Sequence, residues 1–126
     1  MLRWSVLPFC CITFAAAGAA GEPTVTLSTF LGVADCDGVT AWRGDAFLAC
    51  HSPESRLPAD VMVAKPVPNV MSAYVIRLNL KAGKLIYATR IGGNGFTGAF
   101  RIKVDQQGFA YVVGFTKARD FPTTRR

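Results

Sequence analysis

The feature that most constrains this chain is an internal recurrence of strand-forming segments. Residues 88–92 repeat the pattern of residues 28–32 at an offset of 60 positions, and residues 108–116 repeat residues 44–52 at an offset of 64. A recurrence of this length is typical of repeat architectures, in which each unit buries its faces against its neighbours. We therefore distinguish a degenerate copy, residues 28–58, from a better copy, residues 85–122.

Short apolar segments separated by glycine-rich turns predict an all-β fold with antiparallel sheets, because strand-forming residues recur about every ten positions. No segment has helical periodicity. The insert at residues 53–69 contains prolines 53, 58, 66 and 68, so we expect a surface excursion with one short extended piece at 61–64. The composition of residues 109–115 predicts a strand that is buried on both faces. The other expected strands are residues 25–31, 39–42, 46–50, 73–79, 85–91 and 99–104.

The better copy carries a recognisable sequence signature. Residues 87–93 read Tyr-Ala-Thr-Arg-Ile-Gly-Gly, residues 104–116 read Val-Asp-Gln-Gln-Gly-Phe-Ala-Tyr-Val-Val-Gly-Phe-Thr, and residues 120–122 read Asp-Phe-Pro. This pattern resembles the SBBP-type β-propeller repeat of secreted bacterial proteins. Residues 94, 96 and 97 depart from it, since that family often carries acids there. The signature residues of the turns and strands are Gly92, Gly93, Asp105, Gly108, Gly114, Asp120 and Pro122.

The resemblance implies a β-propeller type of fold over residues 25–124, with about one and a half blades, as in a fragment of a larger propeller. Residues 39–42, 45–52, 72–79 and 84–91 would be the four strands of one blade, in that order. Residues 25–31 would belong to the preceding blade, and residues 99–104 and 109–116 would open the next one. Because propellers close with about 4 to 8 blades, we expect open sheet edges and self-association through them.

The resemblance also implies a function. We expect a non-catalytic protein that acts as a scaffold or binding surface at the bacterial cell exterior, with carbohydrate or protein at the cell surface as its partner. One alternative is a fragment of a propeller hydrolase or lyase whose catalytic residues lie outside this chain. Another is a calcium-stabilised adhesion module.

The first twenty residues have the order of a secretory signal peptide. A positive start at Arg3 precedes an apolar run at residues 4–14 and small residues at 15–20, so residues 1–20 are expected to be removed near Ala20. A membrane anchor is the alternative, but the run is short of the roughly 20 residues that span a bilayer. We expect no membrane span after cleavage and a secreted, periplasmic or cell-surface location.

Two cysteines, Cys36 and Cys50, remain after the signal segment, which contains Cys10 and Cys11. An oxidising compartment favours a disulfide between them. Two separate thiols, with Cys50 buried in a strand and Cys36 in a turn, are the alternative. The sequence leaves both open.

The chain has a formal net charge of +6, yet its basic residues are scattered among the expected strands. Scattered cations are typical of a solvated face, so we expect no nucleic-acid partner.

Four further patterns suggest chemistry, and each has a simpler interpretation. Residues 93–98 fit the letters of a dinucleotide motif, but the motif needs a helix where a strand is expected. Asp35, Asp37 and Asp45 are candidate calcium ligands in acidic turns that lack the closing glutamate of a dedicated site. His51 has no second histidine as a partner, and the aromatic residues suit a core as well as a carbohydrate groove. We therefore assign no catalytic residue, no cofactor and no metal ligand.

Overall fold

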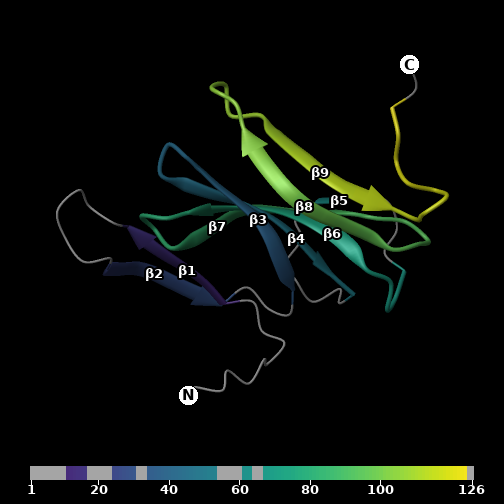
Figure 1. The fold of residues 1–126 in the computed structure, drawn as a ribbon, viewed down its shortest axis with the longest axis horizontal. Helices are drawn as coiled ribbons and strands as arrows, with labels where there is room; N and C mark the ends of the chain where they lie inside the picture. Colours follow the sequence, from purple (N-terminus) through teal and green to yellow (C-terminus); the bar gives the residue numbers. More distant parts are fainter. Residues whose placement is uncertain (1–10, 17–23, 31–33, 54–60, 64–66, 125–126) are drawn as a thin grey trace.

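The structure is a computed structural model, and it describes residues 11–16, 24–30, 34–53, 61–63 and 67–124. Within these residues the chain is all-β and contains no helix. The strands form three separate sheets, of two, five and two strands, and none of these sheets closes on itself (Figure 1). The predicted fold class, all-β with antiparallel sheets, is confirmed.

The largest sheet has the strand order β3-β4-β6-β7-β5. Its first four strands are β3 (Asp35–Trp42), β4 (Asp45–Ser52), β6 (Ser72–Asn79) and β7 (Lys84–Ile91), and each pairs antiparallel with the next. This is the strand order expected from the sequence. The short strand β5 (Val61–Val63) comes from the proline-rich insert and pairs parallel with β7, which we did not expect.

Strand β3 begins earlier than predicted. The expected strand covers only residues 39–42, because the preceding residues are rich in glycine and aspartate, but residues 35–38 also pair with the end of β4. A bulge leaves Asp37 without a partner in the ladder, and a bulge lets a strand accommodate such a residue without ending. Pairing with a neighbouring strand has overridden the local preference of these residues for a turn.

The second sheet of interest is the hairpin of β8 (Thr97–Val104) and β9 (Ala110–Thr116). Its ladder repeats the ladder of β3 and β4 pair by pair, with an offset of 63 in the first strand and 64 in the second. Even the bulge recurs at the same place, at Asp37 in β3 and at Phe100 in β8. The two hairpins therefore follow like backbone paths, as the sequence recurrence predicted. The offsets differ because the second turn is one residue longer.

Strand β8 packs across one face of the large sheet, over β3, β4 and β6. The core between these two layers contains Phe47, Ala49, Ala73, Val75, Ala99 and Ile102. The opposite face of the large sheet is also apolar and buried, with Leu48, Cys50, Tyr74, Ile76, Leu78 and Ala88. Strands β4 and β6 therefore lie at the centre of the molecule, which explains their nearly continuous hydrophobic sequences.

Strand β9 differs from the prediction. All seven of its residues are exposed, although its composition predicted burial on both faces. It pairs with β8 along its length and faces β6 and β7 of the large sheet across a cavity rather than in close contact. Its β-branched and aromatic residues match those of the buried strands, but no described strand lies beyond it to cover them. The prediction of burial was therefore wrong.

The third sheet consists of β1 (Cys11–Ala16) and β2 (Thr24–Phe30), which pair antiparallel. Strand β2 begins one residue before the expected strand at 25–31, whose last residue lies outside the described residues. Strand β1 belongs to the segment predicted as a signal peptide. The cleavage of this segment as a signal peptide stays a prediction.

Candidate functional site

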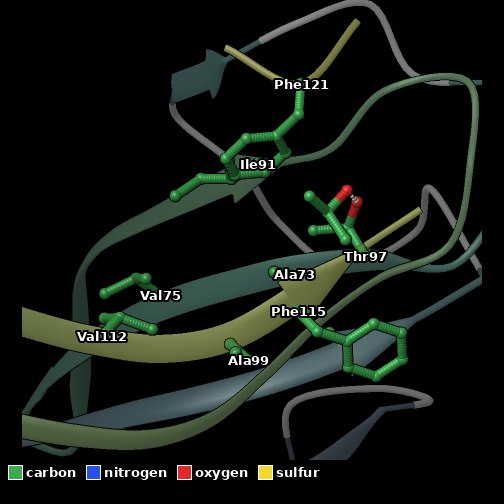
Figure 2. Close-up of a pocket in the computed structure, with 11 residues that line it drawn as sticks. Ala73, Val75, Ile91, Thr97, Ala99, Val112, Phe115 and Phe121 are labelled. Atoms are coloured by element: carbon green, nitrogen blue, oxygen red, sulfur yellow. Dashed lines mark hydrogen bonds between the residues drawn. The ribbon is translucent and has the colours of Figure 1, made fainter. Parts of the chain in front are cut away.

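A cavity lies between the β8–β9 hairpin and the large sheet (Figure 2). Its volume is about 320 Å³, within the usual range for a small-molecule pocket. Phe121 lies over Ile91 at one end, and Val112 of β9 lies next to Val75 of β6 (Figure 2). The lining residues are Ala73, Val75, Ile91, Thr97, Gly98, Ala99, Val112, Gly114, Phe115, Thr116 and Phe121.

The lining of this cavity is apolar apart from two threonine hydroxyls. The hydroxyls of Thr97 and Thr116 lie 2.9 Å apart and share a hydrogen bond, drawn dashed in Figure 2. The Thr116 hydroxyl also accepts a hydrogen bond from the backbone N–H of Ala118. No titratable side chain is among the lining residues. The cavity can therefore accept an apolar group, but its lining supplies neither a general acid nor a general base.

Among the signature residues, Asp105 organises the turn between β8 and β9. Its carboxylate accepts hydrogen bonds from the backbone N–H groups of Gln107 and Phe109, both at 2.9 Å, and from the Tyr111 hydroxyl at 3.0 Å. Desolvation alone would raise the pKa of Asp105, but these hydrogen bonds outweigh it and lower the pKa. Gly108 completes the turn at φ = 94°, which suits glycine. Asp105 thus has a structural task in the turn.

Replacing Asp105 with asparagine is expected to lower the pKa of Tyr111. The hydrogen bond from Tyr111 to Asp105, followed by the negative charge of that carboxylate, raises the pKa of Tyr111 in the native chain. Without the charge the phenol should titrate nearer its ordinary value of about 10. An NMR pH titration of the assigned tyrosine rings would measure this. Tyr74 and Tyr87 serve as controls, because burial is the main cause of their raised pKa values; an unchanged Tyr111 titration would contradict the prediction.

Gly93 and Asp120 of the signature join the chain after β9 to the turn before β8. The Asp120 carboxylate accepts a hydrogen bond from the backbone N–H of Asn94 at 2.7 Å, and the Asn94 side chain accepts one from the backbone N–H of Arg119. A Cβ on Gly93 would lie 2.3 Å from this carboxylate, so only glycine fits there. The signature pairs a glycine before β8 with an Asp-Phe-Pro after β9 because these two segments are in contact. We call this contact between residues 93–94 and 119–120 the latch.

The remaining signature residues are also structural. A Cβ on Gly92 would lie 2.9 Å from the Ser72 hydroxyl, and one on Gly114 would lie 2.0 Å from the backbone oxygen of Gly98. Both glycines therefore allow a close approach between neighbouring chain segments. Pro122 is exposed and follows Phe121, whose ring closes one end of the cavity.

The structure separates the candidate calcium ligands. Asp35 and Asp37 lie beside His51, with carboxylate-to-ring distances of 4.0 and 3.6 Å, whereas Asp45 begins β4 and pairs with Arg77. The His51 ring also packs against Phe96 and Phe100. Among the described residues, no three His, Cys, Asp or Glu side chains are arranged to hold a metal ion.

The dinucleotide interpretation of residues 93–98 requires a helix that begins near Gly98. Residues 97–104 form strand β8 instead. This segment therefore has no helix N-terminus that could hold a pyrophosphate.

Cys36 and Cys50 are directly opposite one another on β3 and β4, and a disulfide joins them. Cys50 is fully buried in the core on that face of the sheet. The bridge closes a segment with a sequence separation of 14. It ties the beginning of β3, which the sequence had not predicted as strand, to the centre of the sheet.

Replacing Cys36 and Cys50 together with alanine is expected to lower the free energy of unfolding by about 3 kcal/mol, because a loop of about 15 residues is no longer restrained in the unfolded chain. Urea unfolding of the variant and of the oxidised native chain would measure the difference. The native chain treated with dithiothreitol is the matched control and should unfold at the midpoint of the variant. Equal midpoints for the oxidised chain and the variant would refute the prediction.

Two arginines, Arg77 and Arg90, are not solvated as the sequence predicted for the basic residues; their side chains contact buried groups. Arg77 donates hydrogen bonds from Nε and Nη2 to the buried carboxylate of Asp45, whose other oxygen accepts one from Asn79 at 2.9 Å. Arg90 is 3% exposed, donates a hydrogen bond to the Ser72 hydroxyl and lies over the Tyr74 ring. Local sequence does not predict these contacts, because the partners are 32 positions apart for Asp45 and Arg77 and 18 apart for Ser72 and Arg90.

Comparison of the chain with models of protein families, with curated proteins and with solved structures found no match. In the part of the chain that the structure describes, there is no helix long and apolar enough to cross a membrane.

Proposed function

We propose that this chain is a non-catalytic, exported segment of β-propeller type that acts as a scaffold or binding surface outside the bacterial cell. The observation that carries this proposal is the pairwise identity of the β3–β4 and β8–β9 ladders, bulge included. The sequence resemblance to the SBBP-type repeat and the four-stranded antiparallel order of β3, β4, β6 and β7 support it.

The layering also supports a propeller-type arrangement. In a propeller, each blade is a four-stranded sheet that covers the face of its neighbour. Here the first strand of the second hairpin packs over the first three strands of the preceding sheet. The signature residues stabilise the β8–β9 turn, form the latch and allow close approaches between backbone segments, as described above. These structural roles agree with a scaffold function.

The location and the role are tested together by expressing the full chain, with a C-terminal tag, in a Gram-negative bacterium. We expect a tagged species in the periplasm or medium whose intact mass lacks residues 1–20. A full-length species confined to the cytoplasm would contradict export.

The exported protein is then incubated with an array of cell-wall and plant polysaccharide fragments. Retention of a fragment at unchanged mass supports a binding role, whereas a shortened product would contradict the non-catalytic assignment.

A further inference from the structure

Strand β9 presents an open edge that lacks the usual protection. Among the described residues it pairs with β8 on one side and with no strand on the other. Its seven residues, Ala-Tyr-Val-Val-Gly-Phe-Thr, contain no charge and no proline. Edge strands of soluble proteins usually carry a lysine, a proline or a bulge that blocks further pairing. The bulge of this hairpin lies in β8, so the open edge of β9 is regular.

The equivalent strand of the first hairpin shows which kind of strand pairs with such an edge. Strand β4 is the counterpart of β9, and its second edge is covered by the antiparallel strand β6. Strand β6 contains Ala73-Tyr74-Val75-Ile76, and β9 begins Ala110-Tyr111-Val112-Val113. A strand with the composition of β9 is therefore the kind of strand that this edge accepts.

The hydrogen-bond pattern of β9 fixes which backbone groups are free. Phe109 and Lys117 direct their backbone groups toward the β8 side, where Phe109 accepts from Asp105 and Lys117 donates to Phe96. Because backbone groups alternate along a strand, the intervening odd-numbered residues also face β8. The N–H and C=O groups of Ala110, Val112, Gly114 and Thr116 consequently point to the open edge.

We propose that β9 pairs antiparallel with β9 of a second copy of this chain, about a two-fold axis at Val113. This register places Val112 opposite Gly114 and Ala110 opposite Thr116, so the free groups of one strand meet those of the other. Val113, whose own backbone groups are used by β8, then faces its counterpart as a non-hydrogen-bonded pair. The outcome is a continuous sheet of four strands, β8-β9-β9-β8.

Side chains on the outer face of the hairpin agree with this register. Phe109, Tyr111 and Val113 alternate along β9 with Val112, which lines the cavity, and are 67%, 61% and 67% exposed. Phe115 is 44% exposed and stacks on the rings of Phe96 and Phe100 of its own chain. The two-fold axis places Tyr111 opposite Phe115 of the second copy, an aromatic cross-strand pair that favours association. It also places Lys117 of the second copy opposite Phe109, on the face that carries the Asp105 carboxylate.

Within the described residues, the large sheet packs against β8 and faces β9 across the cavity, and no strand occupies the second edge of β9. The two-fold symmetry makes the contact closed, so the expected species is a dimer.

Light scattering coupled to size-exclusion chromatography of the full chain tests the association. We expect a concentration-dependent mass that levels off at two chains. Replacing Val112 with proline removes an edge N–H in each copy and should raise the dissociation constant about tenfold or more, while the N–H groups that bond β8 remain. Val112→Thr keeps the N–H and is the matched control, expected to remain dimeric. A mass of one chain at all concentrations, or a mass that keeps rising, would overturn the proposal.

Cysteine cross-linking tests the register. In Val113→Cys the two new cysteines face each other with Cα atoms about 4.5 Å apart, within reach of a disulfide. In Tyr111→Cys each new cysteine faces Phe115, and the two lie about 13 Å apart along the strands. The tryptic peptide of residues 104–117 contains no natural cysteine, so its disulfide-linked homodimer reports this contact alone. We expect that homodimer in Val113→Cys only; equal cross-linking of both variants, or of neither, would overturn the register whether or not the protein is exported.

Discussion

Replacing Phe47 with alanine is expected to lower the free energy of unfolding by about 3–5 kcal/mol, the usual cost of removing a buried phenylalanine ring. Phe47 is 1% exposed and lies in the core between the large sheet and β8. Its ring meets the edges of the Trp42 and Tyr87 rings, with centroids 6.5 Å apart in both pairs. Among the described residues, no other fully buried side chain on that face of the sheet is as large. Its loss should leave a cavity that its neighbours cannot fill.

The same substitution should loosen the second hairpin more than the first. Strand β8 is held by this core, whereas β4 and β6 also contribute to the core on the opposite face. Urea unfolding measures the total loss, and amide hydrogen exchange of Ala99 and Ile102 compared with that of Leu48 and Ile76 measures its distribution. Val39→Ala is the control, since Val39 is 60% exposed and its truncation should change stability by less than about 0.5 kcal/mol. A loss below 1 kcal/mol in Phe47→Ala would show that the two layers do not depend on this ring.

Local sequence was sufficient where a strand and its turn agree. The hairpin of β6 and β7 was expected nearly to the residue, because Gly83 marks a turn with φ = 62° between two strongly β-forming segments. The internal recurrence also predicted the like paths of the two hairpins. These features depend on residues close together in the chain or on a pattern that the chain itself repeats.

The features that were missed depend on long-range neighbours. Residues 35–38 have turn composition but are held as strand by pairing with β4 and by the disulfide from Cys36. The apolar sequence of β9 predicted burial, yet burial requires a covering strand, and composition cannot report whether one is present. The candidate site shares this limit, since the cavity in Figure 2 combines residues of β6, β7, β8 and β9 with Phe121.

The contact between Asp45 and Arg77 was missed for the same reason, because the two residues are 32 positions apart. Asp45 stands in a Gly-Asp turn, where an acid needs no further explanation. In the structure it is 5% exposed, and its carboxylate accepts hydrogen bonds from the side chains of Arg77 and Asn79. The Arg77 guanidinium also lies over the Phe47 ring at 5.1 Å from its centre. This ion pair therefore borders the core between the layers.

Replacing Arg77 with methionine is expected to cost about 3 kcal/mol of stability, at the lower end of the range for breaking a buried ion pair. The lower end applies because the Arg77 side chain is 28% exposed while that of Asp45 is only 7% exposed, so water can reach part of the pair. The cost arises mainly from Asp45, whose buried carboxylate loses the two donors on Oδ2. Urea unfolding measures the loss. Lys103→Met, at an exposed position of β8, is the matched control and should change stability by less than about 0.5 kcal/mol.

A double-mutant cycle separates the ion pair from the packing of the arginine stem. If the buried charge is the cause, adding Asp45→Asn to Arg77→Met should restore part of the stability, because the neutral amide has less need of the missing cation. If Arg77 acts mainly by covering Phe47 and Trp42, the second substitution should add its own cost and restore nothing. Asp45 is the first residue of β4, and Arg77 lies near the end of β6. The first outcome would show that this charge pair helps to fix the register between β4 and β6, on which both layers depend.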